Sequence, residues 1–181
     1  MGDSKLKIIC YTGGTCGDLI TALIDPRGAV LNEKNGTVQL TSDRIGLKKP
    51  HLFSTDDKKD QYLESLGTKY GSVSSHDLAY HINRNHEFIG ITVTDFNAAL
   101  WAATRFKELH CDVVWQEMQA ACGVSSVSEY ARMMIDFSFL VKQHTKTTIP
   151  LESVITRLHE IIQIDFAECL IGRFLIYPHA K

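Results

Sequence analysis

The sequence lacks the features that mark several specialised classes of protein. Its five cysteines are scattered and form no Cys-x-x-Cys pair, which argues against a disulfide framework or a zinc site and favours reduced thiols in the core. No apolar run approaches the roughly 20 residues of a membrane span, and the first residues show no signal-peptide pattern. We therefore expect a protein of the cytoplasm, without a membrane partner.

An excess of charge of one sign is also missing. A net charge of −2, with 22% charged residues, gives no strong signal for nucleic-acid binding. What the sequence does have is 44% hydrophobic residues over 181 positions, which is enough for one well-buried domain and short for two. Since no repeat, low-complexity segment or linker divides the chain, we expect residues 1–181 to form a single α/β domain.

A glycine-rich stretch separates the first expected strand, residues 6–11, from the first expected helix, residues 19–24. Glycine permits positive φ and leaves backbone N–H groups accessible, and the start of the helix adds its positive end. This geometry can bind anions. The candidate ligand-binding residues of this loop are Thr12, Gly13, Gly14, Thr15, Cys16, Gly17 and Asp18.

The same loop lacks the cation that phosphate-binding loops carry. A full phosphate loop has Lys and Ser or Thr directly after its last glycine, whereas Asp18 and Leu19 stand there in this chain. A carboxylate at that place repels phosphate, so ATP or GTP hydrolysis is not expected. A tight turn that serves only the fold remains the alternative. Cys16 is either a small residue that fills this turn or a thiol activated by the helix N-terminus.

The rest of the chain alternates between predicted strands and helices. Asn35-Gly36 predicts a hairpin between residues 29–31 and 37–40. Caps are expected at Ser54 or Thr55, at Ser74 or Ser75 and at Asp95. The further helices are predicted at 54–66, 76–82, 98–110, 113–121, 126–144 and 151–162, with strands at 88–94 and 147–149 and an apolar tail at 166–177 that docks on the domain.

This order predicts a three-layer α/β fold with a mainly parallel sheet flanked by helices. Ligands of such sheets lie outside the carboxyl ends of the strands, where the glycine loop and Asp95 would converge. His76 and Asp95 are the candidate catalytic bases. Asp77 and His81, four residues apart, pair with each other or help to position a base, and no complete set of metal ligands is identified. The cations that could supply the missing charge, unless they are only solvated, are Arg44, Lys48, Lys49 and Arg84.

The pattern resembles the sulfotransferase-like branch of the phosphate-loop (P-loop) superfamily, which also contains nucleotide kinases. The likeness rests on residues 11–24, on residues 89–106, and on the segment Ile149-Pro150-Leu151-Glu152-Ser153-Val154 with the helix that follows it. It implies a nucleotide or phosphoadenosine phosphosulfate as donor. The family's donor contacts are replaced here by Thr15 for Lys, Asp18 and Leu19 for the Thr pair, Thr94 for Arg and Ala102 for Ser.

A second likeness concerns only the loop. Gly13-Gly14-Thr15 and Gly17 resemble the glycine-rich opening of two-domain glycosyltransferases, but this chain has no room for their second domain.

Two functions follow as expectations. The first is a degenerate P-loop-like α/β protein that has lost catalysis and binds another protein, as an accessory or virion component encoded by a phage. This is favoured because Lys, Arg and Ser are missing together, and each removes a contact that phosphoryl or sulfuryl transfer needs. The alternative is a small sulfotransferase-like or kinase-like enzyme that uses a phosphorylated nucleotide donor.

Overall fold

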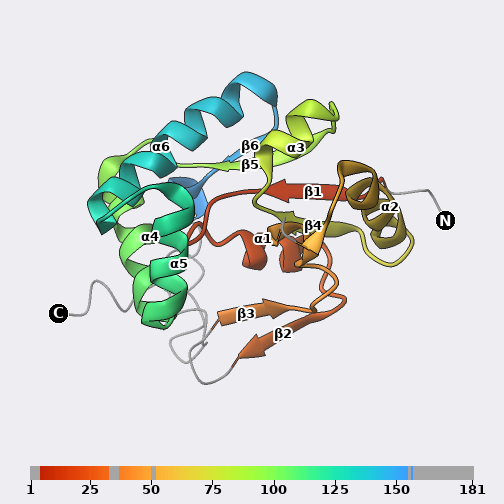
Figure 1. Cartoon of the computed structure of the whole chain (residues 1–181), viewed down its shortest axis with the longest axis horizontal. Helices are drawn as coiled ribbons and strands as arrows, with labels where there is room; N and C mark the ends of the chain where they lie inside the picture. Colours follow the sequence, from red (N-terminus) through yellow and green to blue (C-terminus); the bar gives the residue numbers. More distant parts are fainter. Residues whose placement is uncertain (1–4, 33–36, 50–51, 155, 157–181) are drawn as a thin grey trace.

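A parallel sheet of four strands forms the centre of the computed structural model, which describes residues 5–32, 37–49, 52–154 and 156 (Figure 1). The strand order is β4-β1-β5-β6. The strands are β1 (Lys7–Cys10), β4 (Ser72–Ser75), β5 (Phe88–Thr92) and β6 (Thr148–Pro150). Ile9 of β1 pairs with Ser74 on one side and with Ile89 on the other. Because every pairing is parallel, the carboxyl ends of all four strands meet at one edge of the sheet.

Helices flank this sheet. They are α1 (Gly17–Ile24), α2 (Asp56–Gly67), α3 (Leu78–Asn83), α4 (Phe96–Leu109), α5 (Asp112–Cys122) and α6 (Val127–His144), with a 3₁₀ turn, η1 (Gly46–Lys48). In Figure 1, α6 lies above the sheet and α1 below it. The predicted α/β class, with a parallel sheet flanked by helices, is confirmed, and the arrangement is consistent with three layers.

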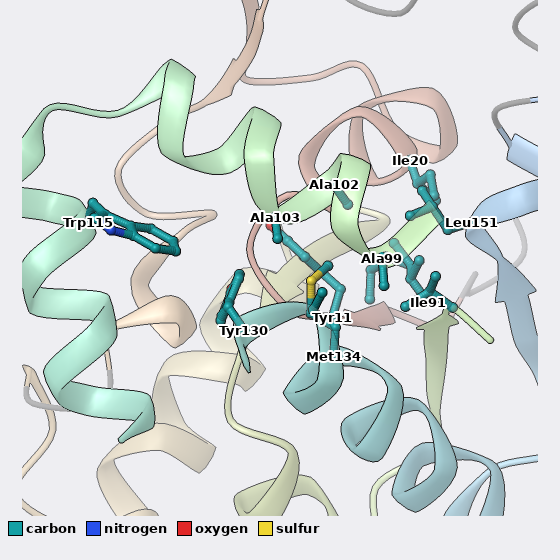
Figure 2. Packing of buried hydrophobic residues seen from close by; sticks show 13 residues of the cluster. Tyr11, Ile20, Ile91, Ala99, Ala102, Ala103, Trp115, Tyr130, Met134 and Leu151 are labelled. Carbon is teal, nitrogen blue, oxygen red and sulfur yellow. The ribbon is translucent and has the colours of Figure 1, made fainter. Parts of the chain in front are cut away.

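Alternate residues of β1 enter different hydrophobic clusters, since successive side chains of a strand point to opposite faces. Ile8 and Cys10 pack with side chains of α2, α3 and α6. Ile9 packs with side chains of α1 and α4 and with the first half of α6. Figure 2 shows this second cluster, in which Ala99 and Ala102 of α4 turn toward the packed centre. These small residues let α4 approach the loop after β1 closely.

The predicted hairpin is confirmed. It consists of β2 (Ala29–Asn32) and β3 (Thr37–Leu40), which pair antiparallel with Val30 opposite Gln39. The two strands form their own sheet, and β3 packs along α1. The hairpin therefore stands beside the loop that joins β1 to α1 (Figure 1).

Two of the predicted helix caps, Thr55 and Asp95, are confirmed, and Ser126 is a further cap. The side chains of Thr55, Asp95 and Ser126 accept hydrogen bonds from backbone N–H groups in the first turns of α2, α4 and α6, at 3.4, 2.7 and 3.2 Å. The parallel strand expected at residues 147–149 is present as β6.

The cap expected at Ser74 or Ser75 is wrong, because both serines belong to β4. Asp77 caps α3 instead and accepts from Tyr80 N at 3.1 Å. The run Ser-Val-Ser-Ser is fully buried, which a strand tolerates only if its hydroxyl groups find partners. They do, since Ser72 donates to Thr21 O at 2.7 Å and Ser74 donates to Asp18 at 2.9 Å.

The cysteines only partly match the expectation of core thiols. Cys10 is buried, but Cys111 and Cys122 are exposed near the two ends of α5. Cys169 and the apolar tail at residues 166–177 lie outside the described residues, as does most of the predicted helix 151–162. None of the helices in the described part of the chain combines the length and the apolar character needed to cross a bilayer.

Candidate functional site

A pocket of about 740 Å³ opens at the carboxyl edge of the sheet. One wall is formed by the loop between β1 and α1, and the facing walls come from β3, the segment around η1 and the end of α4. Tyr11 and His76, which directly follow β1 and β4, lie at its base. This is where parallel sheets place their ligands, since loops from adjacent strands leave in different directions there.

Most of the predicted site residues meet in this pocket. Those that line it are Gly13, Gly14, Cys16, Gly17, Asp18, Lys48, Lys49 and His76. The other candidates, Thr12, Thr15, Arg44, Arg84 and Asp95, do not line it. Thr12 and Thr15 are buried within the turn, where Thr15 Oγ1 donates to Thr12 O at 2.7 Å, and Arg84 and Asp95 serve other contacts.

Asp18 is the centre of the polar side of the pocket. Its Oδ2 accepts from Lys48 Nζ at 2.7 Å, and its Oδ1 accepts from Ser74 Oγ at 2.9 Å and from the Tyr11 hydroxyl. Desolvation would raise the pKa of Asp18, but the charge of Lys48 and these three hydrogen bonds outweigh it and lower the pKa. Asp18 therefore stays ionised, and Lys48 neutralises it.

Lys48 supplies a cation that the glycine loop does not contain. It comes from η1, thirty residues further along the chain, and its side chain is only 18% exposed. Lys48 and Lys49, two of the cations expected to supply charge to the loop, both line the pocket. Sequence reasoning missed Tyr11 and Ser74 as partners of Asp18, because nothing in their local pattern distinguishes them from ordinary strand residues.

Close packing explains the glycines of the loop. A Cβ on Gly13 would lie 2.6 Å from a ring carbon of Phe106, and one on Gly14 would lie 2.4 Å from Ala102 O. Gly14 also has a φ of +90°. A Cβ on Gly17 would lie 2.3 Å from the ring of Tyr11. All three glycines are therefore required by α4 and Tyr11, with or without a ligand.

Cys16 is not an activated nucleophile. It adopts the left-handed conformation, with a φ of 59°, directly before α1. Desolvation raises the pKa of its thiol to about 12, and the smaller opposing effect of Arg105 does not offset this. The thiol therefore stays protonated at neutral pH, and Cys16 serves the turn as a small side chain.

His76 borders the pocket with its ring edge-on to Tyr11, at 4.7 Å between ring centroids. Its side chain is exposed and lines the pocket. Desolvation and the nearby charge of Lys48 lower the pKa of His76. The ring is therefore neutral at pH 7 and can both donate and accept one hydrogen bond.

The remaining predicted residues have structural roles. Arg84 forms ion pairs with Asp57 and Asp60 on the acidic face of α2, so it does not supply charge to the pocket. Asp95 caps α4. Arg44 is fully buried, and its guanidinium donates to backbone carbonyl groups of Thr21, Asp25 and Ser72.

The expected pair of Asp77 and His81 does not form either. Asp77 binds Lys59 at 2.7 Å, and His81 Nε2 lies 2.8 Å from Ser75 Oγ. Because α3 begins at Leu78, the four-residue spacing does not place both side chains on one helical face. Within the described residues, no three or more His, Cys, Asp and Glu side chains are grouped so that they could hold a metal ion.

Comparisons of this chain with protein-family models, with curated proteins and with solved structures found no match.

Proposed function

We propose that this protein binds a small anionic ligand in the pocket beside the glycine loop. The observation that carries the proposal is the position of Lys48, which brings an ammonium group to the loop where the sequence of the loop itself offers only a carboxylate. With Lys49 at the same pocket, two cations face one anion, Asp18. The first turn of α1 adds N–H groups that have no partner within the helix.

The size and lining of the pocket support this class of ligand. A volume of about 740 Å³ lies within the range of small-molecule sites. Besides the charged residues, Val38, Leu40 and Leu109 offer apolar surface from the hairpin and α4. A ligand with an anionic end and a less polar body matches this combination of charged and apolar lining residues. A nucleotide and phosphoadenosine phosphosulfate both belong to that class, so the likeness to the sulfotransferase-like branch of the P-loop superfamily points in the same direction.

Transferase chemistry would need a group that takes a proton from the acceptor. His76 is a pocket residue with a neutral ring that can accept that proton, but its lowered pKa makes it a weak base. Asp95 is not suited to accepting the proton, since its carboxylate is engaged as the cap of α4.

Thermal unfolding with added ligands tests the binding proposal, because a ligand that prefers the folded state raises the melting temperature. We expect inorganic phosphate, ADP or phosphoadenosine phosphate to raise it, and Lys49→Ala to reduce the rise by more than half. Lys142→Ala, which removes an exposed lysine of α6, is the matched control and should leave the rise unchanged. No rise for the wild-type protein at millimolar concentrations of every ligand would refute ligand binding at this pocket.

The second candidate is a protein-binding accessory, such as a virion component of a phage. It is favoured by the packing of the three glycines, which gives the loop a purpose without any ligand. Exposed apolar side chains on α6 also favour it, since Phe139 is 68% and Leu140 is 42% exposed. If the chain has this function, a partner protein that co-purifies with the wild type should no longer co-purify with the Phe139→Ser variant. The same partner should still co-purify with the Lys49→Ala variant. The opposite pattern would contradict it.

A further inference from the structure

The hydrogen bonds of Asp18 leave one acceptor position open toward the pocket. A carboxylate can accept about four hydrogen bonds, two at each oxygen. Oδ1 already accepts from Tyr11 and Ser74, whereas among the described residues Lys48 alone donates to Oδ2. The side chain is 28% exposed and lines the pocket, so the remaining position on Oδ2 can be reached by a ligand.

An anionic ligand cannot satisfy this position with its charged end. Two anions in contact repel each other, and Asp18 stays ionised because Lys48 holds it so. The ligand must therefore turn a hydrogen-bond donor toward Oδ2 and its anion toward the lysines. An ammonium group would donate as well, but Lys48 and Lys49 at the same pocket disfavour a third cation. A neutral donor such as a hydroxyl group fits both conditions.

We propose that the pocket selects a hydroxylated anion, such as a phosphorylated polyol or sugar, whose hydroxyl group donates to Asp18 Oδ2 while its anionic group faces Lys49 and the first turn of α1. This inference rests on the proposed anion-binding function and names the ligand chemistry of the same site. Asp18, which would repel a simple phosphate, is on this account a group that determines specificity.

Two ligands that differ only in their hydroxyl groups test the inference on the unaltered protein. Glycerol 3-phosphate and propyl phosphate have the same carbon chain and the same charge. Binding measured by calorimetry should be at least about tenfold tighter for glycerol 3-phosphate, since a hydrogen bond to a charged group is stronger than one between neutral groups. Equal binding of both would overturn the inference and leave the proposed function standing. Binding of neither compound, nor of inorganic phosphate, would overturn both.

A variant then assigns the preference to Asp18. Asp18→Asn removes the charge and should reduce the preference for glycerol 3-phosphate to less than about threefold, while propyl phosphate binds equally well or more tightly. Ser74→Ala is the matched control, because it removes a donor from Oδ1 and leaves the open position on Oδ2 intact. The control should keep the tenfold preference. A folded Asp18→Asn protein that keeps the full preference for glycerol 3-phosphate would show that another residue binds the hydroxyl group.

Discussion

Gly14, in the loop after β1, and Asp18, in the first turn of α1, are close in the sequence, yet the structure gives them different roles. Gly14 is fixed by its left-handed backbone and by the carbonyl group of Ala102, which leaves no space for a side chain. Asp18 is fixed by the partners of its carboxylate, of which Lys48 and Ser74 are distant in sequence. A glycine pattern in a sequence cannot by itself separate close packing from ligand approach, because both need the absence of a side chain.

Alanine at Gly14 should therefore be costly. A Cβ would strain a backbone with a φ of +90° and would overlap Ala102 O at 2.4 Å. We expect a loss of about 3 kcal/mol in the free energy of unfolding, measured by urea denaturation. Gly123→Ala is the control, since Gly123 has a φ of +66° and nothing within 4 Å of the added atom. It should lose only about 1 kcal/mol. Similar losses in the free energy of unfolding for both variants would mean that the packing of Gly14 against α4 contributes nothing to stability.

At the scale of elements, the link between β4 and α3 shows why one prediction was wrong. Buried strands of parallel sheets are usually apolar, so a run of three serines around one valine does not indicate a strand. The run becomes a strand because α1 and α3 supply partners for its hydroxyl groups. His81 of α3 is the partner on one side, and its Nδ1 also lies 3.2 Å from Nδ1 of His86.

The contact between His81 of α3 and Ser75 of β4 should make the free energy of unfolding depend on pH. Desolvation and the charge of His86 lower the pKa of His81 to about 4, compared with 6.5 for an unperturbed histidine, and Asp77 opposes this only weakly. The unfolded chain therefore binds a proton that the folded protein does not between pH 6.5 and 4. The contribution of neutral His81 is complete above pH 6.5 and is lost as the pH falls toward 4, by about 3 kcal/mol in total.

Urea denaturation of the wild-type protein and of His81→Gln across this range measures the effect. The variant should be less stable at pH 7, and its stability should fall less steeply between pH 6.5 and 4. His144→Gln, at the exposed end of α6, should follow the wild-type slope. If the slopes of wild type and His81→Gln coincide, His81 does not carry the pH dependence.

At the scale of the whole molecule, Arg44 joins segments that are distant along the chain. Its buried guanidinium donates to carbonyl groups at the end of α1, in the turn before β2 and at the start of β4. The segment that carries η1 is thereby anchored to the sheet, and this places Lys48 beside Asp18. One buried cation thus supports the wall of the pocket without reaching the pocket itself.

Replacing Arg44 with lysine should destabilise the whole fold. An ammonium group cannot reproduce the planar set of donors, so buried carbonyl groups would lose their partners. We expect Arg44→Lys to lower the free energy of unfolding by about 3 kcal/mol and to weaken anion binding as well. Arg132→Lys, at an exposed position of α6, is the control and should change stability by less than about 0.5 kcal/mol. Wild-type stability in Arg44→Lys would contradict this anchoring role.

The sequence by itself determined the elements of this protein whose signals are local. Hydrophobic periodicity, caps such as Thr55 and Asp95, and Asn35-Gly36 predicted most helices, the hairpin and the α/β class, because each depends on residues within a few positions of one another. Local patterns also identified the glycine loop and the lysines at residues 48 and 49 as candidate ligand-binding residues.

Only the tertiary structure decided what these residues do together. It separated Lys48 from Arg44 and Arg84, which look alike as cations in the sequence but bind a pocket carboxylate, backbone carbonyl groups and the acidic face of α2 respectively. It also showed that Gly13 and Gly14 are required by α4. The physical reason is that charge pairing and close packing join residues far apart along the chain, and no local pattern encodes which partner a charge or a missing side chain will meet.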